Sequence, residues 1–176
     1  MFLQATSYKL KSSSGYTLVE AIIYIAILAV LAVTFISLLF TMTRAYVNFR
    51  LARDIVSSSS LALERMIGEI KRAETVNVSS ALDISPGRLV LDTTDNSGSA
   101  TTMDFFLSSG VLMIKEGSGA AASTTSARVV VDRLVFRQIN TANSSAVKIE
   151  MTLSASRGEV IRIEKFYVTA VLRGSY

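Results

Sequence analysis

The stretch from Gly15 to Glu20, Gly-Tyr-Thr-Leu-Val-Glu, leads directly into an apolar run from Ala21 to Thr43. This run of 23 residues contains no charged residue, no proline and no glycine. At about 1.5 Å rise per residue it would form about 35 Å of helix, which is enough to cross a hydrocarbon core of about 30 Å. A single segment can satisfy its backbone in lipid only as a helix. The sequence therefore predicts a membrane-spanning helix near its beginning.

Glu20 places a carboxylate where the apolar run begins. A charge at that depth is costly and by default indicates a function, provided that a partner is available. The free N–H groups at the start of a helix would favour an anion in the first turn. If the chain were cut after Gly15, the new α-amino group on Tyr16 would add a full positive charge nearby. The alternative interpretation is that Glu20 only caps the helix of an ordinary signal anchor.

The polar leader with Lys9 and Lys11, the junction of Gly15 with Tyr16, Glu20 and the apolar run together form a pattern. This pattern resembles the N-terminal signature of type IV pilins and pseudopilins, the substrates of prepilin peptidase. The resemblance implies cleavage after Gly15 and methylation of the new N-terminus at Tyr16. It also implies an assembly role for Glu20, which would neutralise the terminal amine of an adjacent subunit and so set the register of a filament.

The same resemblance implies partners and a location. The partners are prepilin peptidase, other pilins or pseudopilins, inner-membrane lipid before assembly, and indirectly an assembly platform with its ATPase. The chain would cross the inner membrane once, with its C-terminal part outside the cytoplasm, and would then enter a pilus or pseudopilus. Positive charges nearly balance across the apolar run, so the charge count does not decide the orientation.

Four parts are expected along the chain. Residues 1–15 form a leader peptide, and residues 16–43 form a transmembrane and filament-core helix. Residues 44–75 form an amphipathic helix, and residues 76–176 form a β-rich globular domain. The leader is too polar to be a secretory signal, so its removal would leave the membrane helix on the mature chain.

Beyond the membrane, helical spacing predicts that the helix continues as an amphipathic segment. Its apolar stripe consists of Phe49, Ala52, Val56, Leu63, Ile67 and Ile70. Four serines, Ser57 to Ser60, interrupt the pattern. Serine side chains compete for backbone hydrogen bonds, so the helix could kink or break there.

From residue 76 onward, short apolar runs bounded by turn residues predict strands. They cover residues 88–92, 101–107, 111–115, 128–139, 146–153 and 159–173. Residues 116–127 are expected to form a mobile surface loop. In the last strand, the apolar residues before Glu164 and those after Lys165 fall on opposite faces, so a bulge near these two residues would bring them to the same face. The expected fold class is α+β and pilin-like, with the long N-terminal helix packed on an antiparallel sheet.

Three segments carry a second, more diffuse resemblance, to J-type minor pseudopilins of type II secretion and to W-type minor pilins. They are Leu63 to Ile70 in the helix, Leu134 to Phe136, and Phe166 to Arg173. Many pilins close their C-terminal region with a disulfide and carry a proline in the membrane helix. This chain has no cysteine, and its one proline is Pro86.

Composition disfavours catalysis. The chain has no histidine and no cysteine, which are the commonest acid–base and nucleophilic residues. A turn between strands accounts for Asp92 and Asp95 better than a calcium site does. Arg128, Arg133 and Arg137 are interleaved with apolar residues and lack an aromatic platform, so no nucleic-acid partner is expected. We expect a non-enzyme without a cofactor, a metal or a catalytic residue.

The sequence therefore predicts a structural minor subunit of a type IV pilus or type II secretion pseudopilus, processed by prepilin peptidase. Two alternatives remain open. One is a signal-anchored periplasmic binding module that acts alone, and the other is a membrane-tethered hydrolase. The first alternative predicts a monomer that keeps residues 1–15, and the second requires a pocket of perturbed carboxylates.

Overall fold

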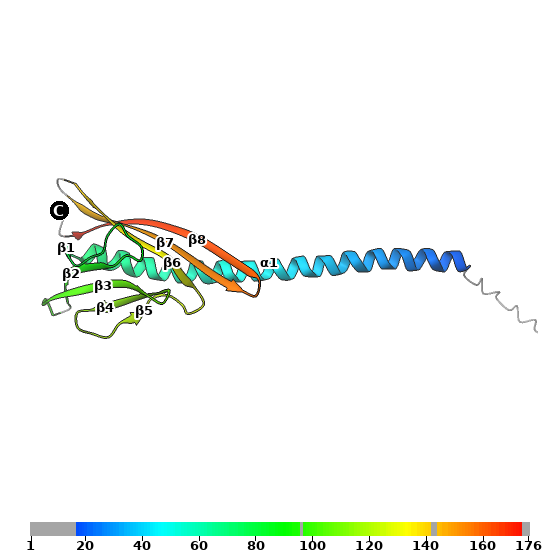
Figure 1. Cartoon of the computed structure of the whole chain (residues 1–176), viewed down its shortest axis with the longest axis horizontal. Helices are drawn as coiled ribbons and strands as arrows, with labels where there is room; N and C mark the ends of the chain where they lie inside the picture. The colour runs from blue at the N-terminus through cyan, green and yellow to red at the C-terminus, as the bar shows by residue number, and fades with distance from the viewer. Residues whose placement is uncertain (1–16, 96, 142–143, 174–176) are drawn as a thin grey trace, which may run out of the picture. The chain divides into compact units, whose positions relative to one another are not determined.

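The computed structural model describes residues 17–95, 97–141 and 144–173. In that part the chain forms one helix, α1 (Leu18–Arg72), followed only by strands (Figure 1). The strands are β1 (Thr75–Val76), β2 (Leu89–Thr94), β3 (Ala100–Ser108), β4 (Val111–Glu116), β5 (Ala122–Ser123), β6 (Val130–Asn140), β7 (Ser145–Arg157) and β8 (Val160–Val171). The chain divides into two compact units, the first ending at Thr43 and the second beginning at Arg44.

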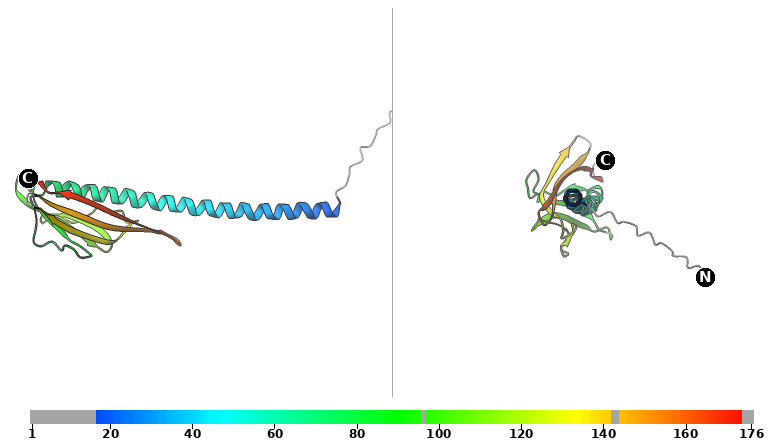
Figure 2. Two further views of the ribbon diagram at one scale, coloured as in Figure 1. Left: turned by 90° about the horizontal axis from the view of Figure 1, so that it is seen from above. Right: turned by 90° about the vertical axis from the view of Figure 1, so that its right-hand side faces the viewer.

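Two antiparallel sheets make up most of the second unit. The first sheet has the order β1-β2-β3-β4-β5, and the second has the order β6-β7-β8. Both sheets contribute side chains to one core with residues 44–72 of α1, and both lie against that part of the helix (Figure 2). The predicted α+β, pilin-like class is confirmed: a long N-terminal apolar helix is followed by antiparallel sheets.

Helix α1 continues through the four serines without a break. The Ser59 hydroxyl donates to the Val56 carbonyl at 3.0 Å, and the Ser58 hydroxyl accepts the Ser126 N–H at 3.0 Å. Both serines are buried. The predicted kink or break is therefore wrong, because these hydroxyls find partners that leave the helical backbone bonds intact.

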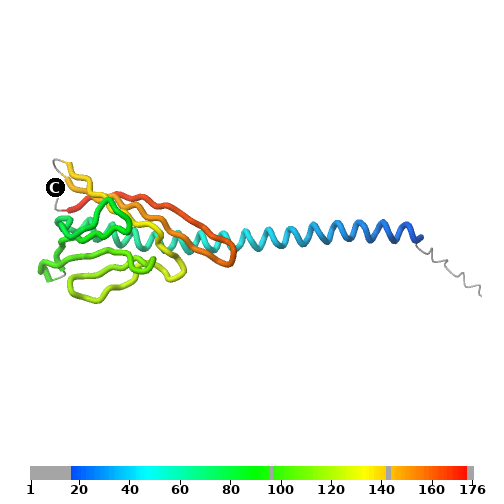
Figure 3. The backbone as a smooth tube through the Cα atoms, viewed as in Figure 1, coloured from blue at the N-terminus to red at the C-terminus, as the bar shows by residue number. Residues whose placement is uncertain are grey.

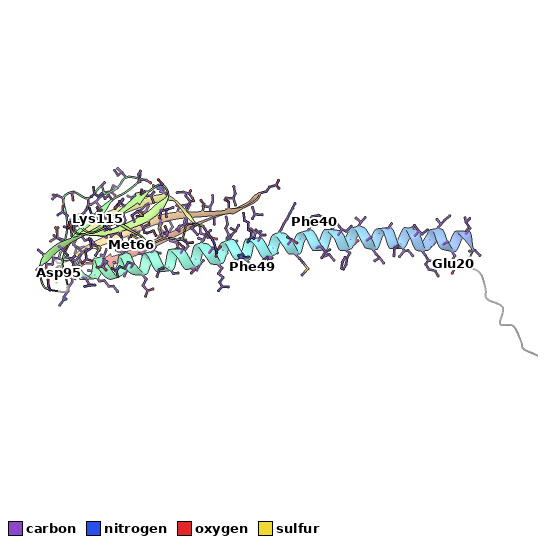
Figure 4. All side chains as sticks on the ribbon, turned by 90° about the horizontal axis from the view of Figure 1, so that it is seen from below. Glu20, Phe40, Phe49, Met66, Asp95 and Lys115 are labelled. Atoms are coloured by element: carbon purple, nitrogen blue, oxygen red, sulfur yellow. The ribbon has the colours of Figure 1, made fainter. Side chains whose placement is uncertain are left out.

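The face of α1 that enters the core differs from the predicted stripe. The buried apolar residues of the helix are Leu51, Ile55, Ala62, Met66 and Ile70. Phe49 is 76 % exposed and Val56 is 51 % exposed, whereas Leu63 and Ile67 only flank the core. Apolar residues occur on several sides of this segment, so periodicity alone did not identify the buried side. Figure 4 shows Phe49 projecting away from the ribbon of the helix.

Strand β7 alternates as the sequence predicts. The inward-facing residues Val147, Ile149, Met151 and Leu153 are buried. Strand β7 is the central strand of its sheet, so one face covers the core and the other remains accessible. That arrangement produces the clean alternation in the sequence.

Strand β8 does not contain the expected bulge near Glu164 and Lys165. Its register with β7 is continuous from Val160 to Val171, and the register shift lies in β6 instead. Ile161 and Ile163 consequently stay on the open face, 67 % and 59 % exposed. No described element covers this face of β8, so these two side chains are not required to turn inward.

Residues 116–127, expected to form a mobile loop, are partly held by hydrogen bonds to β4. Strand β5 pairs with Met113 and Ile114 of β4. The buried Thr125 hydroxyl accepts the Leu112 N–H at 3.1 Å, and the Thr124 N–H donates to the Leu112 carbonyl at 2.8 Å. These bonds are formed with residues distant along the chain, so local composition did not indicate them.

Met66 provides a test of the core. Its side chain is fully buried between the helix and the sheets, and it is labelled in Figure 4. Met66→Ala is expected to lower the free energy of unfolding by about 2–5 kcal/mol, from lost burial and the cavity left behind. Urea unfolding of the detergent-solubilised full chain, followed by tyrosine fluorescence, measures the change.

The matched control is Leu61→Ala on the same helix, because Leu61 is exposed. A surface substitution of this kind is expected to change the free energy of unfolding by about 0.5 kcal/mol or less. Equal effects of the two substitutions would contradict the packing of α1 on the sheets.

Candidate functional site

The first turn of α1 is fixed by Thr17. The Ala21 N–H donates to the Thr17 carbonyl at 3.1 Å, and the Glu20 N–H donates to the Thr17 hydroxyl at 3.3 Å. Thr17 is therefore the N-cap residue, and Glu20 occupies the third helical position. A threonine three residues before a glutamate is the sequence pattern of a capping box, which explains why the helix begins here.

The Glu20 carboxylate lies in that first turn and is partly exposed (Figure 4). Its Oε1 accepts a hydrogen bond from the Tyr24 hydroxyl at 3.0 Å. Within residues 17–95, 97–141 and 144–173 Glu20 forms no ion pair. Among the described residues, Glu20 thus has a neutral hydroxyl as its hydrogen-bond partner and the favourable start of the helix for its negative charge.

Sequence reasoning missed Tyr24 as a partner of Glu20. The signal was present, because residues four apart lie on the same helix face. The other two predicted site residues, Gly15 and Tyr16, lie outside the described residues. The predictions of cleavage after Gly15 and of methylation at Tyr16 therefore stay predictions.

The hydroxyl side chains of the apolar run are satisfied within the helix. Thr34, Ser37, Thr41 and Thr43 each donate to the carbonyl four residues earlier, at 2.9 Å. In a hydrocarbon environment an unpaired hydroxyl costs free energy, and these bonds remove that cost. These polar residues of the run are therefore compatible with lipid.

The apolar run has no protein cover. Every described side chain from residue 18 to residue 43 is exposed, apart from the partly exposed Glu20. Helix α1 is long and apolar enough to cross a membrane. An exposed apolar surface of this length requires lipid or neighbouring apolar helices around it. Residues 18–43 of α1 thus have the length, the composition and the exposure that suit a membrane anchor, and the Glu20 carboxylate lies near their beginning.

The carboxylates considered for calcium, Asp92 and Asp95, accept hydrogen bonds from nearby residues. Asp92 accepts hydrogen bonds from the Thr75 hydroxyl at 2.9 Å and the Asn77 amide at 2.7 Å. Asp95 accepts bonds from the Ser97 hydroxyl at 2.6 Å, the Ser97 N–H at 2.8 Å and the Ser99 N–H at 2.9 Å. These hydrogen bonds hold the pKa of Asp95 below its usual range, and the bond from the Ser97 hydroxyl contributes most. The turn interpretation accounts for Asp95, which follows β2, whereas Asp92 lies within strand β2 and bonds to residues of the neighbouring segment.

Comparison with known proteins gives one match. Residues 10–42 match the family model of the prokaryotic N-terminal methylation motif. The matched segment contains Gly15, Tyr16, Glu20 and nearly the whole apolar run, so the chain carries a type IV pilin-like signature at its N-terminal end. No curated protein and no solved structure matches the chain.

Proposed function

We propose that this protein is a structural minor subunit, a minor pilin or pseudopilin, of a type IV pilus or type II secretion pseudopilus. Prepilin peptidase would cut the chain after Gly15, and Tyr16 would then be methylated. The mature subunit would leave the inner membrane and join a helical filament through the apolar part of α1. The second unit would remain outside the cytoplasm on the filament surface.

The observation that carries this proposal is the Glu20 carboxylate at the start of an exposed apolar helix, within a matched methylation motif, where it forms no ion pair with any residue that the structure describes. The motif's family is structural rather than catalytic. A chain cut after Gly15 would carry an α-amino group on Tyr16, four residues before the Glu20 carboxylate. That amine, on the same chain or on a neighbour, would be the cation that pairs with the carboxylate.

Assembly would follow from two physical terms. Burial of the apolar helix among other apolar helices would provide the non-directional attraction of subunits. The pairing of Glu20 with an amine in a low-dielectric core would select the register, because a charge left unpaired there is costly. Glu20 therefore would contribute specificity more than raw affinity.

The assignment to the minor subunits has separate support. Two of the three segments that resemble J-type pseudopilins and W-type minor pilins contribute to the core of the second unit, where Met66, Leu134 and Phe136 are buried. The absence of cysteine distinguishes the chain from pilins that close a C-terminal disulfide. Because Glu20 is present, the subunit can lie below another subunit in the filament.

Mass spectrometry of the N-terminus of the purified membrane form tests the proposal. The expected mature chain begins at Tyr16 with a methylated α-amino group, and it copurifies with other pilins after mild crosslinking. A chain that keeps residues 1–15 and behaves as a monomer in detergent would contradict the proposal. That result would favour the signal-anchored binding module that acts alone.

A further inference from the structure

A cleft of about 520 Å³ lies in the second unit where three distant chain segments meet. Helix α1 contributes one wall, the segment before β6 and its first residue contribute another, and the end of β7 contributes the third. The residues that line the cleft are Arg50, Leu51, Asp54, Ala127, Arg128, Val130, Ser154, Ala155, Ser156 and Arg157. Figure 3 shows the backbone of the β7–β8 hairpin, orange to red.

The cleft carries an excess of positive charge. Arg50, Arg128 and Arg157 supply three guanidinium groups, and Asp54 supplies one carboxylate. Within the described ranges none of these four side chains forms an ion pair. Other arginines of the same unit do pair with carboxylates: Arg65, Arg72, Arg88, Arg137 and Arg162.

The donors in the cleft suit a tetrahedral oxyanion. A guanidinium presents a planar fork of N–H groups that matches phosphate geometry, and it is always charged. Ser154 and Ser156 add two hydroxyl groups to the lining. Leu51 and Ala155 add apolar surface at the same place. The combination fits a phosphate attached to an organic group.

The position of the cleft along the chain indicates where such a phosphate comes from. Arg50 follows Thr43, the last residue of the apolar run, by seven residues. Seven residues span about 10 Å as helix and at most about 25 Å when fully extended. A bilayer adds a polar headgroup layer of several ångströms on each side of its hydrocarbon core. The length of chain between Thr43 and Arg50 therefore allows Arg50 to reach the headgroups.

Neighbouring side chains fit the same location. Tyr46 and Phe49, between the apolar run and the cleft, are 65 % and 76 % exposed. Tyrosine is enriched at membrane–water interfaces. Arg44 and Arg53 add further positive charge on this segment, which anionic lipids attract.

We propose that this cleft binds the phosphate of an anionic phospholipid headgroup while the chain is anchored in the membrane. Arg50, Arg128 and Arg157 bind the phosphate oxygens, and Asp54 weakens the site by opposing the bound charge. Bound lipid would hold the second unit at the membrane surface. The inference requires membrane anchoring but does not require entry into a filament, so it can fail or succeed independently of the proposed function.

The test is a native mass spectrometry titration of the detergent-solubilised full chain with phosphatidylglycerol and, in parallel, with phosphatidylcholine of the same acyl chains. Phosphatidylglycerol is expected to bind more tightly. The double variant Arg128→Gln with Arg157→Gln is expected to weaken that binding about tenfold or more, because two charged hydrogen-bond donors are lost. Asp54→Asn is expected to strengthen binding several-fold, since it removes the opposing charge.

The matched control is the double variant Arg133→Gln with Lys165→Gln, which removes the same charge from a site away from the cleft. It is expected to leave the affinity nearly unchanged. Arg128 and Arg157 are exposed, so the cleft variant should keep the urea midpoint of the unaltered chain. An equal loss in both double variants, or equal binding of the two lipids, would overturn the cleft assignment.

Two further arms identify the source of the phosphate. Inorganic phosphate that binds with the same dependence on Arg128 and Arg157, and displaces the lipid at equal concentration, would overturn the lipid source. A copurifying acidic protein that is lost in the cleft variant, without any change in lipid binding, would also overturn it. The proposal is supported if phosphatidylglycerol displaces bound lipid and inorganic phosphate at equal concentration does not.

Discussion

Cells that carry Glu20→Ala are expected to process the chain normally, to retain it in the membrane, and to lose it from sheared filaments by about a hundredfold. The reason is that removal of one partner of a buried ion pair costs about 3–5 kcal/mol, since the remaining charge stays buried and unpaired. Immunoblots of the membrane and filament fractions measure the distribution. Insertion should persist because the apolar run is unchanged.

Two further variants separate the charge of Glu20 from its local hydrogen bond. Glu20→Gln keeps an acceptor for the Tyr24 hydroxyl but removes the charge, so it should fail in assembly nearly as Glu20→Ala does. Tyr24→Phe removes the hydroxyl donor and keeps the charge, so incorporation should stay close to normal. The reverse order of effects would indicate that Glu20 acts only within its own helix.

Glu64→Ala is the matched control for charge loss. Glu64 is an exposed carboxylate on the same helix, within the second unit. An exposed charge contributes little to association, so incorporation should not change measurably. If Glu64→Ala reduced incorporation as much as Glu20→Ala, the register role of Glu20 would be refuted.

Gly15→Phe is expected to shift nearly the whole population from the mature chain to an uncleaved precursor, which would migrate more slowly on a gel. A glycine has no Cβ, so a peptidase can approach the backbone closely, and a phenylalanine ring would block that approach. Without cleavage no amine forms on Tyr16, and the precursor should also be absent from filaments. Gel mobility and intact mass report both steps.

Gly15→Ala is the graded control, because it adds only a methyl group. It is expected to slow processing without stopping it. Normal processing of Gly15→Phe would refute the proposed cleavage site, and it would also refute the Tyr16 amine as the partner of Glu20. If the protein is instead a binding module that keeps its leader, neither substitution should have an effect.

Residues 17–43 could be interpreted from sequence because their properties are local. An uninterrupted apolar run of this length predicts a helix that can cross a membrane, and α1 is long and apolar enough to do so. The Thr17–Glu20 spacing determines the first turn, and the capping bond at the Thr17 hydroxyl agrees with it. The alternation of β7 is also a local property, because in a strand with one buried face every second side chain points to the core and is apolar.

Tertiary structure decided what depends on residues distant along the chain. It determined which side of α1 is buried, since apolar residues were available on several sides. It also kept the helix intact at Ser58, whose hydroxyl accepts a bond from Ser126 far along the chain. The cleft is the strongest example, because Arg50, Arg128 and Arg157 are unremarkable singly and share one lining only in the folded unit. Periodicity records the environment of one element, whereas a site built from three segments exists only after those segments pack together.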